Sequence, residues 1–394
     1  MTTEPIDALV IGAGPAGLMA ADTLVRAGRK VVVIEAKPSP ARKFLMAGKS
    51  GLNLTKDEPF DDFMPHFGAA EAFLRPILKD FDPEAVKAWA QALDQEVFTG
   101  SSGRVFPRAM KASPLLRAWL ADLGARGVEL RRGWKWRGWD GEALAFDTPD
   151  GPATLAPTST VLALGGGSWA RLGSDGAWVK LLANKGVKIA PFAPANAGLR
   201  IDWSDHMRRH FGTPLKGIAL SAGNLTSRGE AMISKHGLEG GGIYTLSPAL
   251  RDGAPLQIDL RPDVALEALT MRLNKPRGKA TQSSHIRKGA QLDPAKLALL
   301  LECARPLPQD GAKLAALIKA LPVPYAGFAP MDEAISTAGG IALSELTDDL
   351  ELRGLPGIFV AGEMLDWEAP TGGYLITASL ATGLRAGQAA ARLR

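Results

Sequence analysis

The sequence predicts an α/β protein in which both ends of the chain build one domain and a second domain is inserted between them. A strand, a glycine-rich turn, a helix and a second strand can be followed through the first 35 residues, and another apolar strand and a glycine-opened helix close the chain. In between, the pattern changes to short strands with glycine turns, and then to helices. We therefore expect a discontinuous first domain at 1–190 and 326–394 and an inserted domain at 191–325, β-rich over 191–262 and helical over 263–325.

The turn after the first apolar strand has the spacing G-x-G-x-x-G, in Gly12, Gly14 and Gly17. In such a turn the first glycine allows the tight bend, the second lets a pyrophosphate approach the backbone, and the third lets helix and strand pack closely. The helix that opens with Pro15 and Ala16 would offer free N–H groups and the positive end of its dipole to phosphates. The turn therefore predicts a dinucleotide site of the Rossmann type.

Glu35 ends the second strand, followed by Ala36, about twenty residues after the glycines. An acid in this place binds ribose hydroxyls and disfavours a 2′-phosphate. A glycine-rich turn in some other parallel sheet is the alternative, but the flanking strands and the distance to the acid favour nucleotide binding. The next loop leaves the carboxyl end of a strand, where α/β proteins bind ligands. Its candidates for contacting the cofactor, against the alternative of ordinary loop polarity, are Lys43, Gly48, Lys49, Ser50 and Asn53.

Two later stretches repeat the pattern of a buried strand that ends in glycines. An apolar run that begins at Thr160 ends in Gly165 and Gly166. Near the carboxyl terminus, a second such run ends in Gly362 and Glu363, and a helix then opens at a glycine pair. A glycine-rich junction aims another helix N-terminus at a ligand, and a carboxylate beside it can hold a ligand hydroxyl. The candidates in the opening of this helix are Gly372, Gly373 and Tyr374.

Between these motifs we expect helices over 57–98, a loop over 100–111 and a three-stranded meander over 128–157. The first meander strand interleaves Trp134 and Trp136 with basic residues, which indicates either a nucleic-acid platform or an exposed meander packed by its tryptophans. The segment 271–290 holds six Lys and Arg residues and no acid, and its Pro and Gly residues predict a flexible loop.

The composition is that of an ordinary globular protein, with 46% hydrophobic and 22% charged residues among 394. Cys303 is the single cysteine, so an internal disulfide and a cysteine-based metal cluster are excluded, and no metal site is expected. No apolar run reaches membrane-spanning length, and no signal peptide is visible, so we expect a cytoplasmic protein without a membrane partner. The net charge of +5 is a mild indication of an anionic partner.

Taken together, these stretches resemble the FAD-binding fold of the glutathione-reductase type. More narrowly, the chain is similar to the bacterial flavoprotein family that includes bile-acid-inducible flavoproteins and proteins linked to ribosomal-RNA dihydrouridine. The matching stretches are RKFLMAGKSGLNLT, GRVFPRAMKAS, ALGGGSWARLGSDG, EAMISKHGLEGGGIYTLS and STAGGIALSEL through GEMLDWEAPTGGYLITASLATG. The resemblance implies a discontinuous Rossmann-like FAD-binding domain. It places Gly12, Gly14, Gly17 and Glu35 on the ADP half of FAD, and Gly362, Glu363, Gly372 and Gly373 near the ribityl and flavin half.

One departure from the family concerns the loop after the first acid. Many relatives carry Arg-Cys-Asn there, whereas this chain has Gly51, Leu52 and Asn53. The resemblance therefore does not carry over the relatives' substrate. The chain also lacks a second G-x-G-x-x-G followed by an acid, so NAD(P)H would have to dock transiently as the electron donor, or a different donor would serve.

Three functions fit these observations. The first is a flavoenzyme that transfers hydride between FAD and a carbon–carbon double bond of a small molecule, the second an RNA-modifying flavoenzyme that reduces uridine, and the third a non-catalytic flavin-binding protein. The catalytic acid is unknown. His236 is a weak candidate because histidine titrates near neutral pH, and a structural histidine at a turn is the alternative. Arg104 and Lys111 are candidates for holding an anionic group of the substrate.

Overall fold

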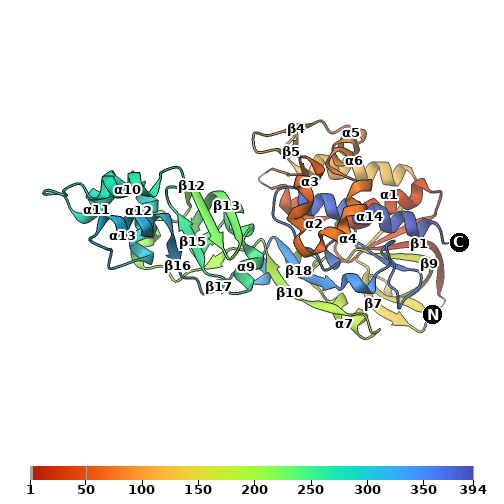
Figure 1. The fold of residues 1–394 in the computed structure, drawn as a ribbon. Helices are drawn as coiled ribbons and strands as arrows, with labels where there is room; N and C mark the ends of the chain where they lie inside the picture. Colours follow the sequence, from red (N-terminus) through yellow and green to blue (C-terminus); the bar gives the residue numbers. More distant parts are fainter. Residues whose placement is uncertain (1–2, 50, 394) are drawn as a thin grey trace. The chain divides into compact units, whose positions relative to one another are not determined.

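The computed structural model describes residues 3–49 and 51–393 and divides the chain into two compact units (Figure 1). The first unit comprises Met1–Ala193 and Ser336–Arg394, and the second comprises Pro194–Ile335. The expected boundaries at 191 and 325 shift to 194 and 335. The later shift has a clear cause, because β16 (Leu321–Val323) and β17 (Gly327–Phe328) still pair with strands of the second unit, β15 (Leu256–Asp259) and β11 (Leu199–Arg200).

A parallel sheet forms the core of the first unit, in the order β6-β2-β1-β9, and β19 also pairs with β9. The Val- and Ile-rich runs of β1 and β2 are buried, as expected for strands that are covered on both faces. The strands are β1 (Glu4–Ile11), β2 (Val31–Glu35), β6 (Glu129–Arg132), β9 (Gly151–Leu162) and β19 (Ile358–Val360). A small separate sheet pairs β10 (Ile189–Ala195) with β18 (Ser336–Ile341).

The expected meander is partly wrong. Its first strand breaks at Gly133, which has a φ of +76°. The residues before the break form β6, parallel to β2, while those after it form β7 (Lys135–Asp140), antiparallel to β8 (Ala143–Thr148). The first residues of β9 pair with β8, and the rest of the same strand pairs with β1 in the parallel sheet. The separate strand expected at Thr160 is therefore the carboxyl-terminal end of β9. Trp136 is buried and Trp134 is half-buried against Phe146, which leaves no exposed aromatic platform.

Small residues let two helices of the first unit pack closely against each other. α14 (Tyr374–Ala391) lies against α1 (Pro15–Arg26), and a Cβ added to Gly383 would stand 2.2 Å from the Ala16 carbonyl oxygen (Figure 1). Asp82 caps the N-terminus of α5 by accepting the Ala85 N–H at 2.9 Å, in the region where helices were expected. The remaining helices of the unit are α2 (Arg42–Ala47), α3 (Phe60–Phe63), α4 (Glu71–Asp80), α5 (Pro83–Ala92), α6 (Ala112–Ala125) and α7 (Trp178–Ala183).

The segment 100–111 is not wholly loop, as was expected. It contains β5 (Arg104–Pro107), which pairs with β3 (Thr55–Lys56) and β4 (Val97–Thr99) in a small antiparallel sheet. The residues of this strand alternate between more exposed and buried positions, as in a strand that is covered on one face.

The second unit is a seven-stranded antiparallel sheet followed by helices. Its other strands are β12 (Thr213–Ala222), β13 (Leu225–Ser234) and β14 (Gly237–Glu239). Its helices are α8 (Gly241–Tyr244), α9 (Ser247–Arg251), α10 (Leu266–Leu273), α11 (Gln282–Gly289), α12 (Pro294–Cys303) and α13 (Gly311–Lys319). The basic segment is therefore only partly a loop, because Thr281 caps α11 within it by accepting the Ser284 N–H at 3.2 Å. None of the helices in the described part of the chain has the length and apolar character needed to span a bilayer.

Candidate cofactor site

The glycine-rich turn between β1 and α1 leaves open space at one of its three glycines. Gly12 has a φ of +105°, and a Cβ on it would stand 2.3 Å from the Ala163 carbonyl oxygen. A Cβ on Gly17 would stand 1.9 Å from the Gly12 carbonyl oxygen. A Cβ on Gly14 would meet no atom within 4 Å, and α1 begins directly afterwards at Pro15. Packing therefore requires Gly12 and Gly17, whereas Gly14 keeps free the space in front of the helix N-terminus.

Glu35 is fixed at the carboxyl end of β2 by the backbone. One carboxylate oxygen accepts the Ala13 N–H at 3.2 Å, and the other accepts the Lys37 N–H at 2.8 Å. Burial raises the pKa of Glu35, and these two hydrogen bonds oppose that rise. The carboxylate thus stands beside the glycine turn with remaining lone pairs for a ligand hydroxyl.

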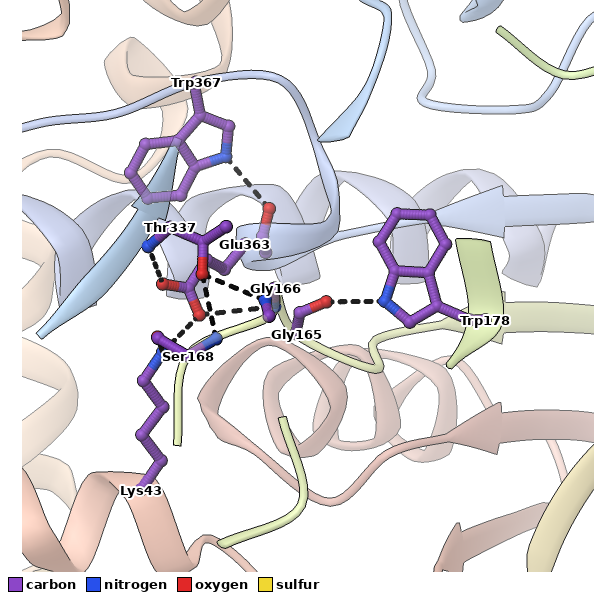
Figure 2. Close-up of polar contacts among 10 residues, drawn as sticks. Lys43, Gly165, Gly166, Ser168, Trp178, Thr337, Glu363 and Trp367 are labelled. Atoms are coloured by element: carbon purple, nitrogen blue, oxygen red, sulfur yellow. Dashed lines mark hydrogen bonds and ion pairs between the residues drawn. The ribbon is translucent and has the colours of Figure 1, made fainter. Parts of the chain in front are cut away.

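A pocket of about 140 Å³ opens next to Ala36. Its walls combine the buried aromatic rings of Trp136 and Trp178 with apolar and small residues such as Leu164 and Gly173. The Trp178 indole N–H donates to the Gly165 carbonyl at 2.8 Å, which fixes that wall (Figure 2). Lys37, Lys135 and Asp175 also line this pocket, and its two aromatic rings suit a planar base.

Glu363 connects three segments of the chain (Figure 2). One of its carboxylate oxygens lies 2.6 Å from the Lys43 ammonium and accepts the Gly166 N–H at 3.3 Å. The other accepts the Thr337 N–H at 3.0 Å. The site therefore brings together Lys43, Gly166 and Glu363, which the sequence suggested separately, and adds Thr337.

Thr337 and Ser168 are contacts that the sequence analysis missed. The Thr337 hydroxyl accepts the N–H groups of Gly167 at 2.9 Å and Ser168 at 3.1 Å, and the Lys43 ammonium lies 2.7 Å from the Ser168 hydroxyl (Figure 2). A Cβ on Gly166 would stand 2.5 Å from the Thr337 hydroxyl oxygen. The one available signal was the small-residue stretch STAGG at 336–340, to which no role was given.

The turn before Glu363 is held by the buried backbone of Gly362, which has a φ of +77°. Its N–H donates to the Thr382 hydroxyl at 3.0 Å. Its carbonyl accepts the Trp367 indole N–H at 2.9 Å (Figure 2). The Leu164 N–H lies 3.1 Å from the Met364 sulfur. These contacts tie the ends of β9 and β19 to α14.

The Tyr374 side chain is held by contacts within the protein. Its phenol donates to Glu58 at 2.7 Å, and its ring packs against Phe63 and Phe67. Burial and the Glu58 carboxylate raise the pKa of Tyr374. A Cβ on Gly373 would stand 2.3 Å from the Thr55 Cα, so the turn at Gly372 and Gly373 packs directly on β3.

The loop after α2 carries a buried polar atom without a partner. Among the described residues, the Asn53 side-chain oxygen has no hydrogen-bond partner, and the same is true of the buried Ser174 hydroxyl near Gly165. Gly48 is held by packing, since its Cβ would stand 2.6 Å from that of Ala112. Lys49 is exposed, and Ser50 lies outside the described residues. Buried polar atoms normally have partners, so the two orphaned oxygens, with the open space at Gly14, fit a bound polar molecule.

His236, Arg104 and Lys111, the candidates for proton transfer and substrate binding, take no part in the contacts described above. His236 belongs to the second unit, at the exposed turn between β13 and β14, so the structure does not place it at this site. Arg104 lies in β5 of the first unit, and Lys111 precedes α6, where its ammonium lies 3.4 Å from the Lys49 carbonyl oxygen.

Two relatives match nearly the whole chain. A protein of Clostridium scindens named 3-dehydro-bile acid delta(4,6)-reductase is 26% identical over 405 residues, covering 97% of this chain and 98% of its own. A ribosomal RNA dihydrouridine synthase of Escherichia coli is 26% identical over 394 residues, covering 94% of each chain.

Among solved structures, the 3-ketosteroid-delta4-(5alpha)-dehydrogenase of Rhodococcus jostii matches with a TM-score of 0.54 and 16% identity, over 99% of this chain and 97% of that chain. The 3-ketosteroid delta1-dehydrogenase of Sterolibacterium denitrificans matches over 100% of both chains, with a TM-score of 0.54 and 13% identity. At these identities the likeness is one of fold.

A family model described as "HI0933-like protein Rossmann domain" matches residues 6–389. The match confirms the predicted α/β class with a Rossmann-like FAD domain and FAD as the cofactor. Together with the relatives, it supports a flavin-dependent oxidoreductase as the class of enzyme. The chain belongs to the HI0933-like Rossmann-domain family.

Proposed function

We propose that the chain binds FAD along the carboxyl edge of its parallel sheet and transfers hydride between the flavin and a carbon–carbon double bond of a small molecule. The observation that carries the proposal is the arrangement of four strand ends. Gly12 follows β1, Glu35 ends β2, Gly165 and Gly166 follow β9, and Glu363 follows β19, all on one edge of one sheet. Ligands of open α/β sheets bind at this edge.

Each end of the site has a distinct task in this proposal. The open space at Gly14 and the N-terminus of α1 receive the pyrophosphate, and Glu35 accepts a ribose hydroxyl. The pocket beside Ala36 takes the adenine. Glu363 accepts a hydroxyl of the flavin side chain, held in place by Lys43 and by the Thr337 N–H. The orphaned oxygen of Asn53 is the candidate for a further polar contact.

FAD supplies the hydride chemistry when bound. The double bond as the reacting group is supported by the Clostridium scindens relative, whose name describes a delta(4,6)-reductase. NAD(P)H that docks transiently is the proposed electron donor, and His236 stays the candidate proton donor. The single cysteine, Cys303, supports the proposed cytoplasmic location, because a reducing compartment disfavours disulfides.

The proposal is tested with the holoprotein under anaerobic conditions. Flavin absorbance is followed after NADH, NADPH or dithionite is added, and then after 4-androstene-3,17-dione and other small conjugated enones are supplied. We expect the enone to restore the oxidised flavin spectrum and to yield a product two mass units heavier. Reduced flavin that no enone reoxidises, while oxygen does, would contradict double-bond reduction.

A second candidate function is RNA modification. The six cations Arg272, Lys275, Arg277, Lys279, Arg287 and Lys288 form no ion pair among the described residues, and the Escherichia coli relative is named a ribosomal RNA dihydrouridine synthase. Unpaired cations on one segment are what phosphate binding requires. The salt dependence of RNA binding tests this candidate.

A further inference from the structure

The small sheet of β3, β5 and β4 presents an amphipathic surface. Phe98 and Phe106 are cross-strand partners, and their rings lie 5.8 Å apart. Phe98 is 37% exposed and Met110, which follows β5, is 36% exposed, although residues of this size are usually buried. We call Phe98, Phe106, Met110 and Arg104 the hairpin surface.

The hairpin surface is continuous with the loop that connects α2 to β3. A Cβ on Gly51 would stand 2.9 Å from the Met110 methyl group and 3.8 Å from the Phe106 ring. The Leu52 N–H donates to the Met110 carbonyl at 3.0 Å, so loop and hairpin share backbone hydrogen bonds. The same loop carries the orphaned oxygen of Asn53 and leads into β3, on which the turn at Gly373 packs.

Arg104 supplies the polar part of the surface. It lies two residues before Phe106 in β5, so the two side chains share a face of the sheet. Its partner across the strand pair, Lys56, is neutralised by Glu58 at 3.2 Å, whereas Arg104 forms no ion pair among the described residues. The Arg104 charge also lowers the pKa of Tyr374 against the larger effect of burial.

We propose that the hairpin surface binds the substrate, and that this substrate is an apolar molecule with one anionic group. The apolar body lies on Phe98, Phe106 and Met110, and the anion is received by the Arg104 guanidinium. Arginine suits this role because its planar fork pairs with both oxygens of a carboxylate. The inference rests on the proposed function, since the surface adjoins the loop and the turn that we assign to the cofactor.

The test compares two probes that differ in one charge, cholate and its methyl ester, below the concentration at which either aggregates. Their binding to the holoprotein is measured by equilibrium dialysis. We expect wild-type protein to bind cholate about tenfold more tightly than the ester, as one charge-assisted contact would give. Arg104→Gln should bring that ratio to about one, whereas Phe98→Asn should weaken both probes equally.

Two control variants distinguish binding at a specific site from nonspecific binding to charged or apolar side chains. Arg108→Gln removes a neighbouring cation that is already paired with Glu96 at 3.3 Å, so the ratio should stay as in wild type. Met271→Asn removes an apolar side chain that is 67% exposed in the second unit, so binding of both probes should stay unchanged.

The proposal is overturned if Arg104→Gln keeps the wild-type ratio, if Arg108→Gln loses it equally, or if wild-type protein binds neither probe. Flavin reoxidation by the neutral 4-androstene-3,17-dione separates this result from the proposed function. Arg104-dependent binding without reoxidation would support the surface and contradict the activity, whereas reoxidation with an unchanged ratio would do the reverse.

Discussion

The Lys43 ammonium lies 2.6 Å from a carboxylate oxygen of Glu363, although 320 positions separate the two residues in the chain. The pair joins α2 to the turn after β19, and the side chains are only 27% and 15% exposed. A partly buried pair costs more to break by removing one partner than it contributes when intact, because the remaining charge loses its compensation. The pair therefore gives a way to separate folding from cofactor retention.

Replacing Glu363 with Gln should weaken FAD retention while the protein stays folded. The amide oxygen can still accept the Thr337 N–H, but the charge that strengthens a bond to a flavin-chain hydroxyl is lost. Glu363→Ala should also lower the free energy of unfolding, by about 1–3 kcal/mol, because N–H groups lose their acceptor. Flavin absorbance after dialysis and urea unfolding measure the two effects. Adding Lys43→Met to either variant gives the coupling of the pair, and full FAD occupancy in Glu363→Gln would refute the assignment.

Gly14→Leu should yield a folded, colourless protein. A side chain there has open space in the protein itself, and the backbone at Gly14 is extended, with a φ of −84°, so the change collides only with the proposed pyrophosphate. The wild type should be yellow and release intact FAD on denaturation, since the single cysteine, Cys303, lies outside the cofactor motifs of the sequence. Gly124→Leu, at another open position within α6, is the matched control and should stay yellow. Normal flavin content in Gly14→Leu would argue against this cradle.

Glu35→Gln should change the stability of the apoprotein in a pH-dependent way and should also lower its affinity for FAD. The folded-state pKa of Glu35 is raised by burial, so the carboxyl favours the folded apoprotein at low pH, and this contribution is lost as the pH rises through the folded pKa. The variant should therefore gain stability relative to wild type as the pH rises from the ordinary carboxyl pKa of 4.5 through the raised folded-state pKa, while its FAD affinity falls about tenfold. Urea unfolding of the apoproteins and FAD titration measure the two. Glu142→Gln, at an exposed turn, should change neither, and a stability difference independent of pH would contradict the argument.

Replacing Arg277, Lys279, Arg287 and Lys288 with Ala tests the RNA candidate. If all four contact a single strand, the slope of log affinity against log salt should flatten by roughly 3 units, because each neutralised phosphate releases counterion. The flavin spectrum should not change, since the segment lies outside the cofactor motifs. A variant with four other exposed cations of the second unit replaced, Lys216, Lys235, Arg305 and Lys313, controls for net charge. Equal slopes in wild type and the first variant would show that this segment does not contact RNA. If neither protein binds RNA, the RNA candidate is contradicted and the small-molecule function remains.

The sequence alone determined the fold class and the cofactor, and it predicted the phosphate end of the proposed site. Those signals are local: the three glycines and Glu35 lie within one βαβ unit, and the spacing of such a unit is set by backbone sterics and helix geometry. The apolar run that ends in Gly362 and Glu363 could be read in the same way, because a strand end and a glycine turn are visible in a few residues.

Only the tertiary structure decided which side chains surround Glu363 at the proposed flavin end. Thr337 forms hydrogen bonds with Glu363, 26 positions away in the chain, and with Gly167, 170 positions away. No local sequence pattern encodes such contacts. The motif makes Tyr374 a candidate for binding the cofactor, but its phenol donates a hydrogen bond to Glu58, which lies 316 positions away. Gly133 divides a run that alternates like a single strand, because β2 offers a parallel partner to its first half only. Strand pairing and buried polar contacts depend on what else the fold brings alongside, and that is fixed by packing over the whole chain.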